Sequence, residues 1–397
     1  AAIDPAVLKK QEDAICNFHA ALPEIEQVAQ FKQDKISALA AKLRTSRRPI
    51  IVCATESVRR QTPALAADAA LLLRAAGKQA GLFYLMPGAN AFAAGLLSDE
   101  TDSIETLIGG IENDSIKALI LVENNPFWQF PDRQRLEKAL ARLELLAVMD
   151  YLNSEAAQKA HICLPTTTLY ESGGIYINQE ARVQIAQPAY RGGTAITLTG
   201  GGNHPPRVYG TGLPGNDPEA AWQWLAYLLE DGQRRRAKDL RADIWKWLAE
   251  TESGFNGIGV VEEIPDDGMR FSRAPDFSKR FSSEPTGGDA DSDDDLEMIA
   301  VERTFGTEEL SAYSACLTDL EEGPGIFICQ TDAEKLNLIE GDRVSLELDG
   351  GKLEANLRIA DNMAAGTLVI SRHKDLDWQK MGTGRTLVRI DQIRKVA

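Results

Sequence analysis

The sequence contains 397 residues, of which 44% are apolar and 26% charged, and it carries a formal net charge of −16. The length predicts two or three domains, and the apolar runs are strand-sized, well short of the roughly 20 residues that span a bilayer. A negative surface repels nucleic acid, and the longest basic run, 234–236, lies in a helical pattern beside acidic residues. We therefore expect no nucleic acid as a partner and no direct membrane insertion.

The first half of the chain alternates between amphipathic helices and short apolar strands. An apolar stripe at helical spacing predicts an N-terminal helical segment over 1–46. The alternation that follows is typical of an α/β domain over 47–265, built on a parallel sheet with helices on both faces. Because such sheets bind ligands at the carboxyl ends of their strands, the loops after Leu85, Val122 and Met149 are where we expect a cofactor in an active relative. The expected strands are 49–54, 80–85, 117–123, 145–149 and 161–164.

The composition changes in the second half. Gly, Thr and Pro are frequent over 165–216, which we expect to be an extended excursion of the α/β domain. A run of aspartates within 266–297 predicts an acidic linker. Alternating apolar residues on either side of the turn at Gly350 and Gly351 predict short strands over 298–397, arranged as a closed or nearly closed C-terminal β-barrel.

Cysteines and histidines give no sign of a metal centre. The five cysteines are scattered, which excludes the paired spacings of iron–sulfur and structural zinc sites and favours a reducing cytoplasm. Cys53, Cys163 and Cys329 fall within apolar strand patterns, so we expect buried free thiols there. The four histidines lack metal-ligand spacing, and no nucleophile lies in a readable arrangement with a base. We expect no catalytic residue and no metal ligand in this chain.

The most specific motif is the segment 165–184, which reads PTTTLYESGGIYINQEARVQ. It resembles a recurring stretch of the molybdopterin oxidoreductases in which Pro, Glu, Gly, Asn, Glu, Gly, Arg and Gln follow one another at fixed spacing. The last hundred residues resemble the dinucleotide-binding domain of that family. The resemblance implies a molybdopterin oxidoreductase scaffold ending in a double-psi-like β-barrel. The candidates for a vestigial pterin site are Gly174, Asn178, Glu180, Ala181 and Arg182.

Three further segments, 83–97, 115–127 and 199–222, resemble one branch of that superfamily. They are similar to the C-terminal region of the large iron–sulfur (G) subunit of bacterial NADH:quinone oxidoreductase, or respiratory complex I. This resemblance implies a structural, cofactor-free module that packs against other peripheral-arm subunits on the cytoplasmic face of the plasma membrane. The parent complex would carry electrons from NADH to quinone through FMN and [2Fe–2S] and [4Fe–4S] clusters held outside this chain.

The motif leaves a second function open. The family has Gly where this chain has Ala181, and the added methyl penalises a positive φ and crowds a pterin or phosphate. Glu180 and Arg182 either clamp a phosphate or pair within the domain, and Asn178 is expected to satisfy backbone groups in a turn. The alternative to a structural module is part of an active molybdenum or tungsten enzyme, such as a formate dehydrogenase, that binds molybdopterin guanine dinucleotide.

Overall fold

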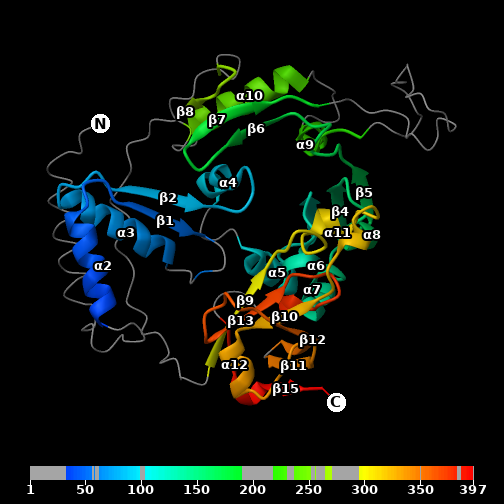
Figure 1. The fold of residues 1–397 in the computed structure, drawn as a ribbon. Coiled ribbons are helices and arrows are strands. Elements are labelled where there is room, and N and C mark those ends of the chain that lie inside the picture. The colour runs from blue at the N-terminus through cyan, green and yellow to red at the C-terminus, as the bar shows by residue number, and fades with distance from the viewer. Residues whose placement is uncertain are drawn as a thin grey trace, which may run out of the picture.

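A computed structural model shows helices packed on four sheets among the residues it describes (Figure 1). The predicted N-terminal stripe is seen in part as α2 (Gln33–Thr45), and 1–32 lie outside the described residues. The described residues are 33–55, 58, 62–98, 103–189, 218–229, 237–251, 255, 264–270, 295–348, 350–381 and 386–396.

The first sheet is a parallel pair, β1 (Ile50–Ala54) and β2 (Gly81–Leu85). Helix α3 (Thr62–Ala75) packs against it, and the hydroxyl of Tyr84 donates a hydrogen bond to the carbonyl of Pro63 at 2.6 Å, which joins β2 to the start of the helix. The opposite face of the pair keeps large apolar side chains in solvent. These are Ile50, Val52 and Leu85, with exposed fractions of 70%, 59% and 53%.

The second sheet is also parallel and is covered on one face by four helices. Its strands are β3 (Ala118–Val122), β4 (Leu145–Asp150) and β5 (Ile162–Pro165). The helices are α5 (Ile104–Glu112), α6 (Pro126–Gln129), α7 (Arg133–Leu140) and α8 (Glu155–Lys159). Leu136, Leu146 and Val148 are almost fully buried and form the centre of the core between helices and sheet. The face opposite the helices again exposes apolar side chains, namely Ile120, Val122, Leu145 and Ile162.

The predicted α/β class with parallel strands is confirmed, and each strand lies within two residues of its predicted position. The strands form two sheets, because no ladder joins β1–β2 to β3–β5 among the described residues. Helix α4 (Ala91–Leu97) follows the first sheet along the chain and contacts β6 instead of its own strands.

The predicted excursion contains an antiparallel hairpin, β6 (Gly174–Ile177) and β7 (Arg182–Ala186). Strand β8 (Met269–Arg270) pairs with β7, and residues 190–217 of the excursion lie outside the described residues. The helices that follow in the chain are α9 (Ala221–Leu229) and α10 (Ala237–Thr251), and α10 runs along the hairpin (Figure 1).

The C-terminal region forms a seven-stranded sheet in the order β14-β9-β13-β10-β12-β11-β15. Strand β11 pairs with β15 at one end and also contacts β14 at the other, so the sheet nearly closes and the predicted β-barrel is confirmed. Strand β9 begins inside the segment expected to be a linker, whose stretch 271–294 lies outside the described residues. The strands are β9 (Asp295–Val301), β10 (Gly325–Ile328), β11 (Arg343–Leu348), β12 (Gly351–Ile359), β13 (Thr367–Ser371), β14 (Thr386–Arg389) and β15 (Ile393–Lys395). The helices are α11 (Glu309–Ala312), η5 (Thr318–Leu320), α12 (Gln330–Lys335), η6 (Trp378–Met381) and η7 (Ile390–Gln392).

The barrel is joined to the second parallel sheet through α6. Trp128 packs against the barrel core, and its carbonyl accepts a hydrogen bond from the side-chain amide of Gln379 at 2.9 Å. Asn125, just before α6, donates to a carboxylate oxygen of Glu309 in α11 at 2.7 Å. These contacts hold α11 beside the carboxyl ends of β3–β5 (Figure 1).

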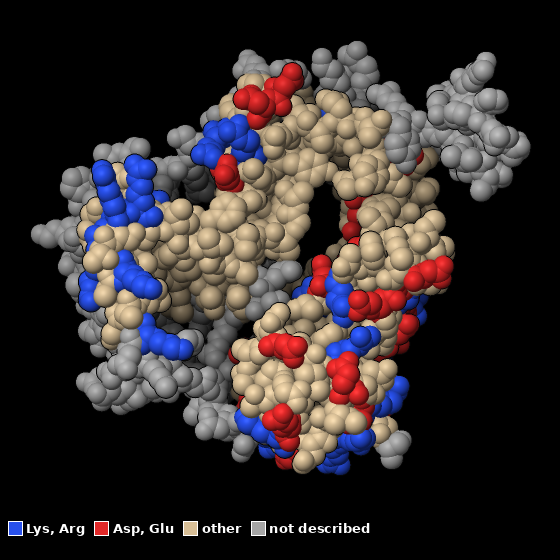
Figure 2. Space-filling model, viewed as in Figure 1, with Lys and Arg blue, Asp and Glu red and all other residues tan. Residues whose placement is uncertain are grey.

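Charge is unevenly distributed on the face drawn in Figure 2, where basic side chains gather over α2 and α3, while acidic and basic ones are interspersed over the barrel and the helices of the second sheet. Lys78 donates to the carbonyl of Arg44, and Arg48 donates to Gln79, so the end of α2 meets the turn before β2. Lys42, Arg44, Arg47 and Arg48 already lie close together in the sequence, and the fold adds Lys78 to them. No helix among the described residues is both long and apolar enough to cross a bilayer.

Candidate functional site

The five motif residues lie on the β6–β7 hairpin, and Asn178 organises its turn. The side-chain oxygen of Asn178 accepts hydrogen bonds from the backbone N–H groups of Glu180 and Arg182, both at 3.0 Å. Its backbone N–H donates to the carbonyl of Arg182 at 3.1 Å. Asn178 therefore satisfies backbone groups of the turn, as the sequence predicts.

Glu180 and Arg182 bind other parts of the chain and not each other. The carboxylate of Glu180 pairs with the guanidinium of Arg270 in β8. Arg182 donates to the carbonyl oxygens of Asp267 at 2.9 Å and Gly268 at 3.3 Å. Both side chains thus fasten β8 to the hairpin. Glu180 forms its salt bridge with a residue 90 positions further on, which lies in the segment expected to be a linker and not in the predicted α/β domain.

Ala181 stands at the position where the family motif has glycine, and its backbone has a positive φ. Its φ is +58°, in the left-handed region, and its N–H donates to the carbonyl of Asn178 at 2.8 Å. An L-residue with a side chain is destabilised there by about 1–2 kcal/mol relative to a right-handed conformation. The turn therefore keeps the shape that glycine adopts without strain, and Ala181 is strained in it.

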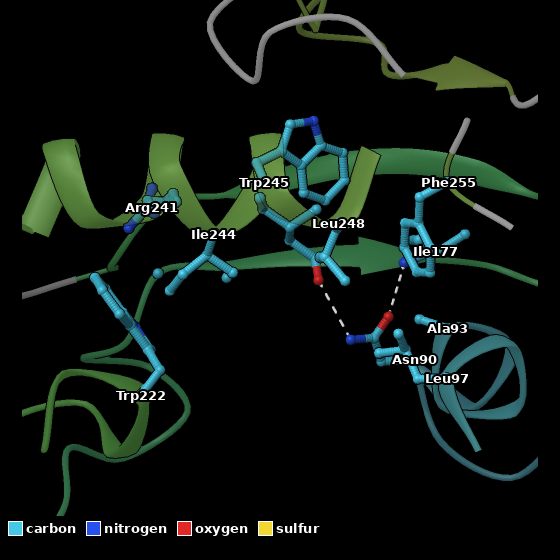
Figure 3. Close-up of a pocket in the computed structure, with 13 residues that line it drawn as sticks. Asn90, Ala93, Leu97, Ile177, Trp222, Arg241, Ile244, Trp245, Leu248 and Phe255 are labelled. Carbon is cyan, nitrogen blue, oxygen red and sulfur yellow. Dashed lines mark hydrogen bonds between the residues drawn. The ribbon is translucent and has the colours of Figure 1, made fainter. Parts of the chain in front are cut away.

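Gly174 lies apart from the turn, in the wall of a cavity of about 230 Å³. The cavity is enclosed by α4, β6 and α10, and its side chains are drawn in Figure 3. Most of the lining is apolar, and the polar side chains in it are those of Asn90 and Arg241. The lining residues are Asn90, Ala93, Leu97, Gly173, Gly174, Ile175, Ile177, Trp222, Arg241, Ile244, Trp245, Leu248 and Phe255.

Asn90 connects the first sheet to this cavity. It ends the loop after Leu85, where the sequence predicts a ligand-binding position, and it immediately precedes α4. Its amide nitrogen donates to the carbonyl of Ile175 at 3.3 Å, and its amide oxygen accepts from the N–H of Ile177 at 2.9 Å (Figure 3). Both polar atoms are therefore used to hold α4 against the free edge of β6.

The loops after Val122 and Met149 meet elsewhere, at the carboxyl ends of β3 and β4. There Glu123, Asp150 and Glu309 form what we call the carboxylate cluster. Burial raises the pKa of Glu309, and the charges of Asp150 and Glu308 raise it further. Partial burial also raises the pKa of Glu123. A hydrogen bond from Thr166 lowers this pKa, and the negative charge of Asp150 raises it. Glu123 has a φ of +47° in this position.

One member of the carboxylate cluster, Asp150, and its neighbour Asn125 are buried. Asn125 is 8% exposed and uses its amide nitrogen on Glu309, while its amide oxygen has no hydrogen-bond partner among the described residues. Asp150 is 6% exposed and accepts from the hydroxyl of Ser154 and the N–H of Leu152, both at 2.9 Å. The cluster is a set of hydrogen-bond acceptors with negative charge, which attracts N–H donors and repels phosphate.

The described residues at these places do not fit molybdopterin guanine dinucleotide. That group carries phosphates and two heterocycles that need many hydrogen-bonding partners. At the hairpin, Asn178, Glu180 and Arg182 are bound to the chain itself. The cavity offers a single guanidinium, and the carboxylate cluster has the same charge as phosphate. We therefore assign none of these places to this cofactor.

The thiols agree in part with the predictions. Cys53 and Cys329 are buried and free, as predicted. Cys163 is free but exposed, so its predicted burial is wrong, because β5 is an edge strand of its sheet. Cys16 lies outside the described residues. Within the described ranges, no group of His, Cys, Asp and Glu side chains is arranged to hold a metal ion.

Residues 16–193 match the family model described as molybdopterin oxidoreductase. The chain is 24% identical to the NADH-quinone oxidoreductase subunit designated G of Shewanella oneidensis, over 89% of this chain and 46% of that protein. It is 26% identical to the same subunit of Salmonella typhimurium over 44% of this chain and 20% of that one. The predicted resemblance to the molybdopterin oxidoreductases and to this subunit is confirmed.

A second kind of relative is the NADPH-Fe(3+) oxidoreductase subunit alpha of Geobacter sulfurreducens, which is 42% identical over 67% of this chain and 28% of that protein. The chain thus spans less than half the length of these curated relatives. Among solved structures, acetylene hydratase from Pelobacter acetylenicus aligns with 74% of this chain and 46% of that chain, at 15% identity and a TM-score of 0.49.

Replacing Ala181 by glycine is expected to stabilise the protein. Ala181→Gly relieves the strain at φ +58° but adds freedom to the unfolded chain, so the free energy of unfolding should rise by up to about 1 kcal/mol. Urea unfolding followed by circular dichroism measures the change. Ala242→Gly in α10 is the control and should lower the free energy by about 1 kcal/mol. A loss of stability in Ala181→Gly would contradict the strained turn, and we expect no pterin to bind to it.

Neutralising Glu309 is expected to change how stability depends on pH. Because burial raises its pKa above the unfolded value of 4.5, the contribution of Glu309 to stability is full below that pH and is lost as pH rises through the folded pKa. Glu309→Gln keeps an acceptor for Asn125 and removes this loss. Urea midpoints should therefore match the parent at about pH 4 and exceed it at about pH 7.

The exposed substitution Glu334→Gln on α12 is the matched control for Glu309→Gln and should leave the pH profile unchanged. Parallel pH profiles for the parent chain and Glu309→Gln would show that ionisation of Glu309 does not oppose folding.

Proposed function

We propose that this chain is a structural, cofactor-free packing module of the peripheral arm of an NADH:quinone oxidoreductase. Its α/β domain (47–265) and its barrel (298–397), joined by the acidic linker, pack against other subunits of that arm on the cytoplasmic side of the membrane. Electron transfer from NADH to quinone then runs through FMN and iron–sulfur clusters held outside these residues. Similarity to an NADH-quinone oxidoreductase subunit along 89% of the chain supports this assignment.

The observation that carries the proposal is the exposed apolar face on each parallel sheet. Parallel sheets in folded proteins are normally covered on both faces. Here Ile50 and Val52 on the first sheet, and Ile120 and Ile162 on the second, are between 41% and 70% exposed. On the second sheet, Ala147 of β4 lies between Ile120 and Ile162 and is already buried, so the exposed apolar side chains flank it. Exposed apolar side chains on a sheet face are typical of contact with another protein. A module that packs against neighbouring subunits buries these faces in the assembly.

The polar groups of the motif support the cofactor-free part of the proposal. Asn178, Glu180 and Arg182 already bind the turn, Arg270 and backbone carbonyls. A ligand would have to break these interactions and replace them. The relative named NADPH-Fe(3+) oxidoreductase subunit alpha supports the wider role, since it too is a subunit of an oxidoreductase that uses a pyridine nucleotide.

The second candidate function is part of an active molybdenum or tungsten enzyme, such as a formate dehydrogenase. The match of residues 16–193 to the molybdopterin oxidoreductase model favours it. The assembled complex that contains this chain separates the two candidates. Elemental analysis should find iron but no stoichiometric molybdenum or tungsten, and oxidised extracts should lack pterin fluorescence. A full equivalent of either metal with pterin would support the enzyme and overturn the structural assignment.

Charging the exposed faces should prevent assembly without unfolding the chain. Val52→Lys and Ile120→Lys each place an ammonium group on one of these apolar faces. In the isolated chain the ammonium stays in solvent, but in the assembled complex it would be buried without a partner. The variants should keep their melting temperature and lose co-purification with the partner subunits on native gels. Leu320→Lys, at a side chain that is 60% exposed away from both sheets, is the matched control and should assemble normally. Normal assembly of all three variants would contradict packing through these faces.

A further inference from the structure

The cavity beside the hairpin has one apolar end with a well-fixed wall. Ile177 and Phe255 are 2% exposed and Trp245 is 5% exposed. The rings of Trp245 and Phe255 meet edge to face, with centroids 6.3 Å apart. The amide of Asn90 uses one N–H and its oxygen on the backbone of β6, so it contributes at most its second N–H at this end. Van der Waals and aromatic contacts therefore dominate what this end offers to a ligand.

The other end of the cavity carries one positive charge. Arg241 and Trp222 lie together at the end of the lining opposite Phe255 (Figure 3). The guanidinium carbon is 5.7 Å from the centre of the Trp222 ring, so the ring face holds the cation in position. A β-carbon at Gly173 would lie 3.1 Å from the carbonyl oxygen of Ala186 and 3.6 Å from a guanidinium nitrogen of Arg241, so glycine lets the backbone approach the guanidinium closely.

Arg241 carries a charge at the cavity that no described carboxylate neutralises, whereas several arginines elsewhere form ion pairs. Arg135, Arg270 and Arg303 each contact at least one glutamate. Arg241 contacts no carboxylate in the part of the chain that the structure describes. In a chain with a net charge of −16, an unpaired guanidinium at the edge of an apolar cavity is a specific attraction for an anion.

We propose that this cavity is a binding site for a small apolar monocarboxylate, and this site goes beyond the structural role proposed above. The carboxylate accepts two hydrogen bonds from the planar guanidinium of Arg241, and an aromatic ring or short hydrocarbon chain lies against Trp245 and Phe255. The volume of about 230 Å³ exceeds the roughly 150 Å³ of an apolar cavity that binds benzene. It accommodates a ring with a short acid side chain.

Phenylacetate is the probe for this site. The test compares it with ligands that share its ring but lack the negative charge of its carboxylate. Ligand-observed NMR and calorimetry on the full chain should show phenylacetate binding with a Kd of about 1 mM. Phenethylamine and benzyl alcohol, which share the ring but lack the carboxylate, should bind at least about tenfold more weakly. Equal binding of phenethylamine, or no phenylacetate binding at about 10 mM, would overturn the proposal.

Two variants locate the site. Arg241→Met should weaken phenylacetate binding at least about tenfold, while Lys246→Met, on the exposed side of the same helix, should leave it unchanged. Ile244→Trp fills the cavity from a side chain that is 43% exposed and should abolish binding with little effect on the fold, which circular dichroism checks. Binding that survives both Arg241→Met and Ile244→Trp lies elsewhere and sinks the proposal. Because the assay involves no partner subunit, its failure leaves the assembly role untouched.

Discussion

A strand in a parallel sheet has two faces to cover, and this requirement dominates the α/β half of the molecule. Helix α3 covers one face of β1–β2, and α5–α8 cover one face of β3–β5, where Leu146 and Val148 are almost fully buried. The opposite faces leave Ile50, Ile120 and Ile162 exposed. Burying such side chains stabilises by about 25 cal/mol for each Å² of apolar surface removed from water. The apolar faces therefore favour packing against other protein. The proposed assembly role rests on this exposed apolar surface and not on a catalytic group.

The motif residues of the hairpin contribute to the fold of this chain. Their polar side chains form a compact group, and each has a partner within the chain. Glu180 and Arg182 hold β8, Asn178 holds the turn, and Asn90 holds α4 against the edge of β6. The strain at Ala181 is tolerated because these surrounding bonds fix the turn. The cavity beside the hairpin then remains as the space enclosed between β6, α4 and α10, with a lining that is mostly apolar.

The sequence was sufficient for the local structure of the α/β half, since strands such as β1, β3 and β4 are marked by short apolar runs between helices with clear periodicity. It could not determine which strands pair, because β1 and β3 have equivalent patterns and the split into two sheets depends on contacts between distant segments. The site shows the same limit. The motif residues were found by their spacing, whereas the partner of Glu180 is 90 positions away, and Arg241 and Trp222 meet at the cavity only through the packing of α9 and α10. Burial of Cys163 was misjudged because an apolar strand pattern does not reveal whether the strand is at an edge.

The carboxylate cluster links the barrel to the ends of the second sheet and limits what those ends can bind. Asn125 binds Glu309 of α11, while the partly buried Glu123 and the buried Asp150 lie at the ends of β3 and β4. Because burial raises the pKa values of Glu123 and Glu309, ionisation of these two side chains at neutral pH opposes folding, and the contacts that bury them must compensate, among them the packing of Trp128 against the barrel core. The same contacts hold α11 where a ligand of an open parallel sheet would approach. A phosphate at this edge would face like charges, whereas docking of the barrel is supported by the hydrogen bond between Asn125 and Glu309, so the carboxylate cluster favours contact with the barrel over phosphate binding at this edge.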